Sequence, residues 1–88
     1  MDLRIANKTA LVTGGASGIG KAIVKELLIN NVKVYFTSRS EEKIEKFLKE
    51  IDRHCNNAQG IVTDISQEGE AERIFDEINK SDNIDILV

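Results

Sequence analysis

The stretch TALVTGGASGIGKAI, residues 9–23, limits the possible folds of this chain more than any other segment. A short apolar run passes directly through a glycine-rich loop into apolar residues at helical spacing. A strand that turns at once into a helix aims free backbone N–H groups and the positive helix end at one point. Anions bind there, and glycines allow both positive φ angles and a close approach of phosphates. The segment therefore predicts a strand–loop–helix unit that holds a phosphate-containing ligand.

Strand and helix patterns alternate along the rest of the chain. The predicted strands are Thr9–Val12, Val32–Thr37, Gly60–Thr63 and the segment 84–88. The predicted helices run from near Ile19 to about Asn30, from a cap at Ser40 onward, and from Ser66 onward. Strands separated by helices pair in parallel through right-handed crossovers. The order β-α-β-α-β-α-β therefore predicts an α/β fold, the first half of a doubly wound parallel sheet with strand order 3-2-1-4, and a ligand at the carboxyl ends of its strands.

Each predicted helix has one apolar face that we expect to pack on the sheet. In the first helix the stripe comprises Ile19, Ala22, Ile23 and Leu27. In the second helix it comprises Ile44, Phe47, Leu48 and Ile51, with Arg53 and His54 near the C-terminal end. In the third helix it comprises Ala71, Ile74, Phe75 and Ile78, and this helix alone would cover one face of the sheet.

The composition excludes several classes of function. Eighty-eight residues allow one small domain, and a net charge of −3 offers no basic surface for nucleic acid. No window approaches the ~18 apolar residues of a membrane span, and the N-terminus lacks a signal-peptide pattern. A single cysteine, Cys55, fits a reducing compartment. We therefore expect a cytoplasmic protein with no nucleic-acid partner and no membrane partner.

The glycine loop contains two overlapping phosphate-loop patterns. Read from Gly15 it is one residue short of a nucleoside-triphosphate loop, in which Ser or Thr follows the lysine and binds Mg²⁺. Ala22 occupies that place, and a methyl group cannot ligate magnesium. The pattern G-x-G-x-x-G also fails, because Ile23 stands three residues after Gly20. The remaining pattern, T-G-x-x-x-G-x-G, suits a dinucleotide pyrophosphate, and the alternative is a tight strand–helix turn without a ligand.

Three segments together resemble the short-chain dehydrogenase/reductase family over the whole chain. They are NKTALVTGGASGIGKAI at 7–23, DIS at 64–66 and IDILV at 84–88. The resemblance implies a Rossmann fold and hydride transfer between a nicotinamide cofactor and a carbonyl compound or secondary alcohol. It also implies that residues of the glycine loop wrap the pyrophosphate and the nearby ribose. These residues are Gly14, Ser17, Gly18, Ile19 and Gly20.

The resemblance also implies an adenine site after the third strand. Asp64 would accept a hydrogen bond from the adenine amino group, with the backbone of Ile65 beside it. Asp64 could instead be an acid that caps the helix predicted from Ser66.

The end of the second strand bears on the choice between NADP(H) and NAD(H). A carboxylate there would accept hydrogen bonds from a ribose 2′-OH and repel a 2′-phosphate. Ser38 occupies this place, followed by Arg39, whose guanidinium can pair with a phosphate and stack on adenine. We therefore expect NADP(H) in preference to NAD(H), unless Arg39 pairs with Glu41 or Glu42 at the surface.

The chain contains no recognisable catalytic group. In the family that it resembles, hydride transfer uses a serine, a tyrosine and a lysine four residues after the tyrosine. The single tyrosine, Tyr35, lies in the second predicted strand with Arg39 four residues on, so we expect Tyr35 to have a packing role. His54 and Cys55 lack partners at metal-ligand spacing, so we expect no metal site.

We therefore interpret residues 1–88 as a partial dinucleotide-binding domain, truncated after the fourth strand and inactive in hydride transfer by itself. A small carbonyl or alcohol substrate would bind only in a full-length form, which we expect to be a homo-oligomer. The fourth strand would be an exposed apolar edge that favours association, and burial would only marginally offset chain entropy. The alternative is a non-catalytic, truncated nucleotide-binding or interaction module.

Overall fold

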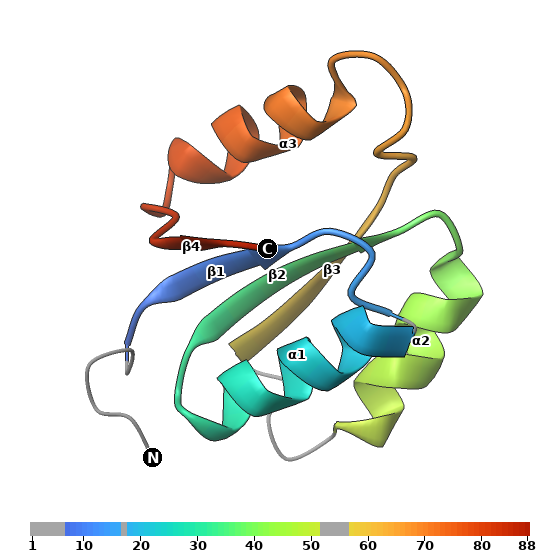
Figure 1. Cartoon of the computed structure of the whole chain (residues 1–88), viewed down its shortest axis with the longest axis vertical. Coiled ribbons are helices and arrows are strands. Elements are labelled where there is room, and N and C mark those ends of the chain that lie inside the picture. The colour runs from blue at the N-terminus through green and yellow to red at the C-terminus, as the bar shows by residue number, and fades with distance from the viewer. Residues whose placement is uncertain (1–6, 17, 52–56) are drawn as a thin grey trace.

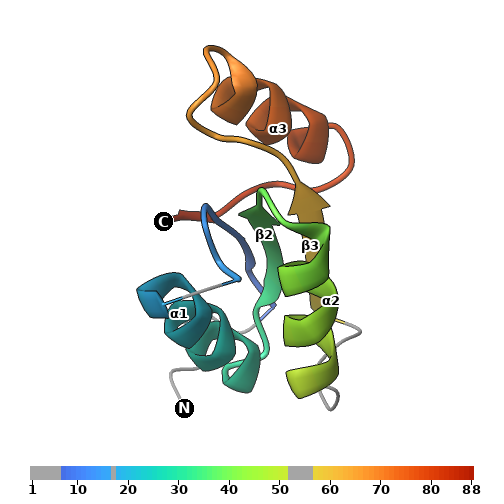
Figure 2. The same cartoon turned by 90° about the vertical axis from the view of Figure 1, so that its right-hand side faces the viewer.

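The computed structural model describes residues 7–16, 18–51 and 57–88. The elements are β1 (Thr9–Val12), α1 (Gly18–Ile29), β2 (Lys33–Ser38), α2 (Glu41–Glu50), β3 (Ala58–Val62), α3 (Glu70–Asn79) and β4 (Ile86–Leu87). The strands pair in parallel in the order β3-β2-β1-β4, which confirms the predicted α/β fold and strand order. Helices α1 and α2 lie on one face of the sheet and α3 on the other (Figures 1 and 2).

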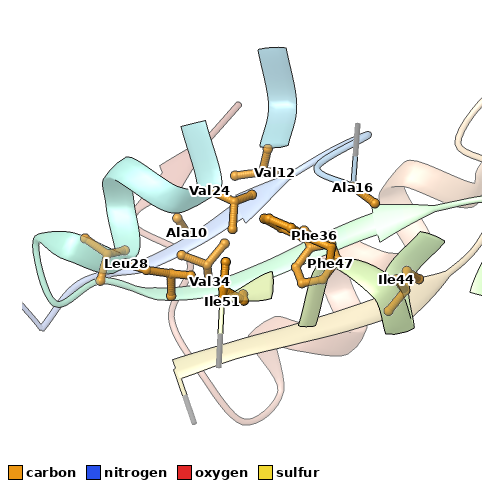
Figure 3. Packing of buried hydrophobic residues seen from close by; sticks show 11 residues of the cluster. Ala10, Val12, Ala16, Val24, Leu28, Val34, Phe36, Ile44, Phe47 and Ile51 are labelled. Carbon is orange, nitrogen blue, oxygen red and sulfur yellow. The ribbon is translucent and has the colours of Figure 1, made fainter. Parts of the chain in front are cut away.

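The larger core lies between the sheet and helices α1 and α2 (Figure 3). Side chains alternate between the two faces of a strand, so Val34 and Phe36 enter this core and Tyr35 faces α3. The rings of Phe36 and Phe47 meet edge to face, with centroids 5.3 Å apart, and join β2 to α2. The smaller core joins the other face to α3 through Leu11, Tyr35, Ile74 and Ile78. Phe75 packs against this core as predicted, whereas Ala71 of the predicted stripe is exposed.

The predicted apolar stripe of α1 is wrong at its first two residues. Ile19 is 81% exposed and Ala22 is exposed, whereas Val24 and Leu28 are the buried residues of α1. Val24 and Leu28 are four residues apart and therefore share one face of the helix. That face packs on the sheet, so the α1 stripe begins one turn later than the apolar pattern indicates.

The third helix begins four residues later than predicted. The amide and hydroxyl of Ser66 donate to Oδ1 of Asp64, at 3.0 and 2.6 Å, which closes a local turn. Gly69 then adopts a φ angle of 78°, and α3 begins at Glu70. An aspartate can thus hold its own backbone in a turn where a helix would otherwise start.

The other boundaries deviate less from prediction. The predicted cap of α2 is confirmed, because Ser40 Oγ accepts a hydrogen bond from the Lys43 amide at 3.2 Å. Strand β3 begins and ends earlier than predicted, and β4 covers only two residues of the predicted segment 84–88. Four residues named in the sequence analysis lie outside the described ranges: Ser17, Arg53, His54 and Cys55. Among the helices that are described, none has the length and apolar character needed to cross a membrane.

Tyr35 ties β2 to the chain that follows α3. Its side chain is buried, in agreement with the predicted packing role, and its hydroxyl donates to Oδ2 of Asp82. The same oxygen lies 2.9 Å from Lys33 Nζ. The hydrogen bond from Tyr35, followed by that from Lys33, lowers the pKa of Asp82 below its ordinary value of 3.8. The ionised Asp82 therefore links α3 to the sheet at neutral pH.

We expect Tyr35→Phe to lower the thermal unfolding midpoint by a few degrees at pH 7, because Asp82 loses a buried donor. Since the pKa of Asp82 is lower in the folded chain, its contribution is present above the ordinary value of 3.8 and is lost as pH falls below that value. The difference between Tyr35→Phe and the parent chain should therefore shrink in acid. Circular dichroism melts at pH 7 and at a pH below the ordinary pKa of Asp82 measure this difference. In a chain that carries Asp82→Asn, the effect of Tyr35→Phe on the midpoint should largely disappear. If Tyr35→Phe lowers the unfolding midpoint equally with and without Asp82, the stabilising link between Tyr35 and Asp82 is contradicted.

Candidate functional site

The carboxyl ends of β1, β2 and β3 surround an open pocket of about 570 Å³, here called the strand-end pocket. Its lining residues are Gly14, Thr37, Ser38, Arg39, Ser40, Lys43, Thr63, Asp64, Ile65 and Ser66. Five of the predicted site residues are therefore brought together from the ends of three strands and the loops that follow them. They are Gly14, Ser38, Arg39, Asp64 and Ile65.

The three glycines of the pattern T-G-x-x-x-G-x-G are required for different structural reasons. Gly14 and Gly18 adopt φ angles of 70° and 57°, which residues with a Cβ atom rarely adopt. Nothing lies within 4 Å of a Cβ built at either position, so both face open space. A Cβ on Gly20 would lie 2.4 Å from the carbonyl oxygen of Gly14, so Gly20 lets α1 approach the loop closely. The predicted need for glycine is thus met by turn geometry at two positions and by backbone packing at the third.

Thr37 fixes the glycine loop against β2. The amide of Gly14 donates to Thr37 Oγ1 at 3.0 Å, and the amide of Gly15 donates to the Thr37 carbonyl at 3.1 Å. Thr37 is only 1% exposed, so water competes weakly for its acceptor oxygens. The sequence pattern predicts Thr37 only as the last residue of a strand. The signal that could have indicated its role is its hydroxyl group, which follows the apolar residues of the segment VKVYF.

Asp64 is held in place by the turn that follows β3. Its Oδ1 accepts from the hydroxyl and the amide of Ser66, and these bonds are the main causes that lower the pKa of Asp64. The positive charge of Arg39 lowers the pKa further. The amide of Thr63 donates to the carbonyl of Ser38 at 2.9 Å, which aligns the ends of β3 and β2. Asp64 therefore caps a turn rather than a helix, and it is an ionised acceptor at the pocket at neutral pH.

Two cations, Arg39 and Lys43, line the pocket beside β2. Both residues are exposed. Neither of them takes part in an ion pair among the described residues. Arg39 therefore forms no ion pair with Glu41 or Glu42 in this part of the chain. The sequence pattern does not predict Lys43 as a pocket residue. The helix cap at Ser40 was the signal that could have indicated Lys43. A cap at Ser40 brings Lys43, three residues later, into the first turn of α2 beside Arg39.

The other predicted site residues lie next to the pocket rather than in its lining. Gly18, Ile19 and Gly20 form the first turn of α1. Gly18 lines a second depression of about 400 Å³, which has Lys43 in common with the strand-end pocket. Across residues 7–16, 18–51 and 57–88, no cluster of three histidine, cysteine or acidic side chains could hold a metal ion.

Comparison with known proteins gives one consistent result. Residues 8–88 match the family model described as short chain dehydrogenase. YvrD of Bacillus subtilis (strain 168), an uncharacterized oxidoreductase, is 34% identical over 88 residues, which are 100% of this chain and 33% of that protein. A variant of ElxO with NADPH bound is 32% identical with a TM-score of 0.84, over 92% of this chain and 33% of the other. The RhlG/NADP active-site complex from Pseudomonas aeruginosa is 31% identical with a TM-score of 0.81, over 94% and 32% respectively. This chain thus spans about a third of the length of these relatives.

Proposed function

Because the chain belongs to the short-chain dehydrogenase family, we propose that it is the part of an oxidoreductase that binds NADP(H). The observation that carries this proposal is the strand-end pocket, which combines a glycine loop, two cations and an ionised aspartate. In this proposal residues 1–88 form a partial dinucleotide-binding domain. A longer form would bind a small carbonyl or alcohol substrate, and the cofactor would supply or accept the hydride there.

The residues of the pocket fit the adenosine end of such a cofactor. Open space beside Gly14 and Gly18 would let a pyrophosphate approach the backbone, and the N-terminal end of α1 favours negative charge. Asp64 would accept a hydrogen bond from the adenine amino group because its pKa is lowered. Ile65 would lie beside the same ring, since both residues line the pocket.

The preference for NADP(H) rests on the charge at the end of β2. Ser38 stands where a carboxylate would reject a 2′-phosphate, and its Oγ accepts from the Ser40 amide at 3.1 Å. Arg39 and Lys43 would bind that phosphate, Arg39 through its planar donors and Lys43 as a point charge. Two similar proteins of known structure, the ElxO variant and RhlG, hold NADPH and NADP respectively, which supports the same choice.

Calorimetric titration of the chain with NADPH, NADH and Mg-ATP tests this proposal. We expect NADPH to bind at least roughly tenfold more tightly than NADH, because one charged hydrogen bond accounts for about that factor. We expect no binding of Mg-ATP, because Ala22 offers no ligand to magnesium. Binding of Mg-ATP alone, or equal affinity for NADH, would overturn the proposed cofactor.

We further propose that this chain binds the cofactor without catalysing hydride transfer. Tyr35 does not line the strand-end pocket, and its hydroxyl is committed to Asp82. The hydrogen bond to Asp82 raises the pKa of Tyr35, whereas an acid–base tyrosine needs a lowered pKa. NADPH absorbance should therefore stay constant when the chain is mixed with a panel of aldehydes and ketones. Consumption of NADPH in proportion to chain concentration would contradict this.

A further inference from the structure

A hydrogen bond between side chains closes the loop that carries Asp64 and Ile65. The hydroxyl of Thr63 donates to Oε2 of Glu70 at 2.8 Å, which joins the first residue after β3 to the first residue of α3. Thr63 is only 7% exposed, so water competes weakly for this bond. Glu70 itself does not line the strand-end pocket.

The charge on Glu70 is balanced within the same turn of α3. Arg73 Nε donates to Oε1 of Glu70, so the two carboxylate oxygens are shared between Arg73 and Thr63. These two hydrogen bonds, with that from Arg73 the stronger influence, lower the pKa of Glu70, whereas the charge of Asp64 raises it. Glu70 is therefore held as an ionised acceptor although another carboxylate lies nearby.

The rest of the loop offers few other restraints. It is neither strand nor helix over residues 63–69, and Gly69 has a φ angle of 78°. Beyond Thr63, whose amide donates to the Ser38 carbonyl at 2.9 Å, its backbone bonds are local. The Gln67 amide donates to the Asp64 carbonyl at 3.1 Å and the Glu70 amide to the Gln67 carbonyl at 3.2 Å. A loop that is ordered before binding loses less entropy when its ligand binds.

We propose that Glu70 is a positioning residue for the nucleotide: by holding Thr63 it orders the loop that presents Asp64 and Ile65. This inference rests on the proposed cofactor function. Glu70 also begins α3, where a negative charge stabilises the helix dipole. The experiment must therefore separate loop ordering from helix stability.

Binding of adenosine 2′,5′-bisphosphate by variants of the chain makes that separation. We expect Glu70→Ala to weaken binding roughly fivefold and to speed hydrogen exchange of the amides of residues 64–69. Glu70→Gln keeps an oxygen acceptor for Thr63 without the charge, and it should restore most of the affinity. Glu72→Ala removes another first-turn acid of α3, and it should leave affinity and loop exchange unchanged. Thr63→Val should weaken binding as much as Glu70→Ala, and the double variant no further.

Several results would overturn the inference. Glu70→Ala could bind with the affinity of the parent chain, Glu70→Gln could be as weak as Glu70→Ala, or the effects of Thr63→Val and Glu70→Ala could add. In each of these cases the parent chain still binds, so the proposed cofactor function stands. A parent chain that binds neither this bisphosphate nor NADPH would overturn both the inference and the proposed function.

Discussion

We expect Gly20→Ala to weaken NADPH binding by about 100-fold, because it displaces the loop that meets the phosphates. A Cβ on Gly20 would lie 2.4 Å from the carbonyl oxygen of Gly14 and 3.1 Å from Cα of Gly15. Both contacts are with backbone atoms, which cannot rotate away as a side chain can. The loop must therefore move, although Thr37 holds the amides of Gly14 and Gly15 in place. The same overpacking should lower the free energy of unfolding by about 1–3 kcal/mol.

A matched control separates loop displacement from loss of helix stability. Ala22→Gly lies two residues further along α1 on its exposed side, and it costs about 1 kcal/mol through helix propensity alone. It should leave NADPH affinity within about twofold. Calorimetry gives both affinities, and thermal melts show whether each variant is folded. A folded Gly20→Ala chain that binds NADPH as well as the parent would contradict the geometry assigned to the loop.

Arg39→Asp should reverse the preference between the two cofactors. The variant removes a cation from the pocket and introduces a carboxylate that repels a 2′-phosphate and can accept hydrogen bonds from a 2′-OH. NADPH affinity should fall roughly 10- to 100-fold and NADH affinity should rise, because a charged hydrogen bond is exchanged for a repulsion. Lys43 also lines the pocket, so Lys43→Ala should weaken NADPH binding and leave NADH binding unchanged.

The control for Arg39→Asp must change the net charge equally without touching the pocket. Lys49→Asp does so, because Lys49 is exposed near the end of α2 and is not part of the pocket lining. It should lower NADPH affinity only slightly, because the lost attraction between Lys49 and the cofactor phosphates acts over a long distance and is screened by salt. If Arg39→Asp leaves the ratio of the two affinities unchanged, the role given to Arg39 is wrong.

The sequence predicts the strand order and most of the pocket because both follow from the alternation of elements. Once the strands are parallel and adjacent, their carboxyl ends lie together, so Gly14, Arg39 and Asp64 meet without any knowledge of side-chain packing. The glycine spacing is equally local, because it reflects turn geometry and the approach of α1 to its own loop.

Two features that the sequence did not predict depend on contacts between elements, and a third depends on a local turn. The buried face of α1 is set by the sheet beneath it, which selects Val24 over Ile19. The role of Thr37 depends on the distance between β2 and the glycine loop, which periodicity does not encode. The late start of α3 results from competition between a local turn at Asp64 and the helix.

The most direct test of the central proposal is an NMR titration of the ¹⁵N-labelled chain with adenosine 2′,5′-bisphosphate. We expect the largest amide shifts at the strand-end pocket, in Gly14, the segment 38–40 and the segment 64–65. Small or no shifts are expected on the α3 face, where Gln59, Arg73 and Ser81 line a separate depression. Shifts confined to the α3 face, or none at saturating bisphosphate, would contradict the assignment of the strand-end pocket to the nucleotide.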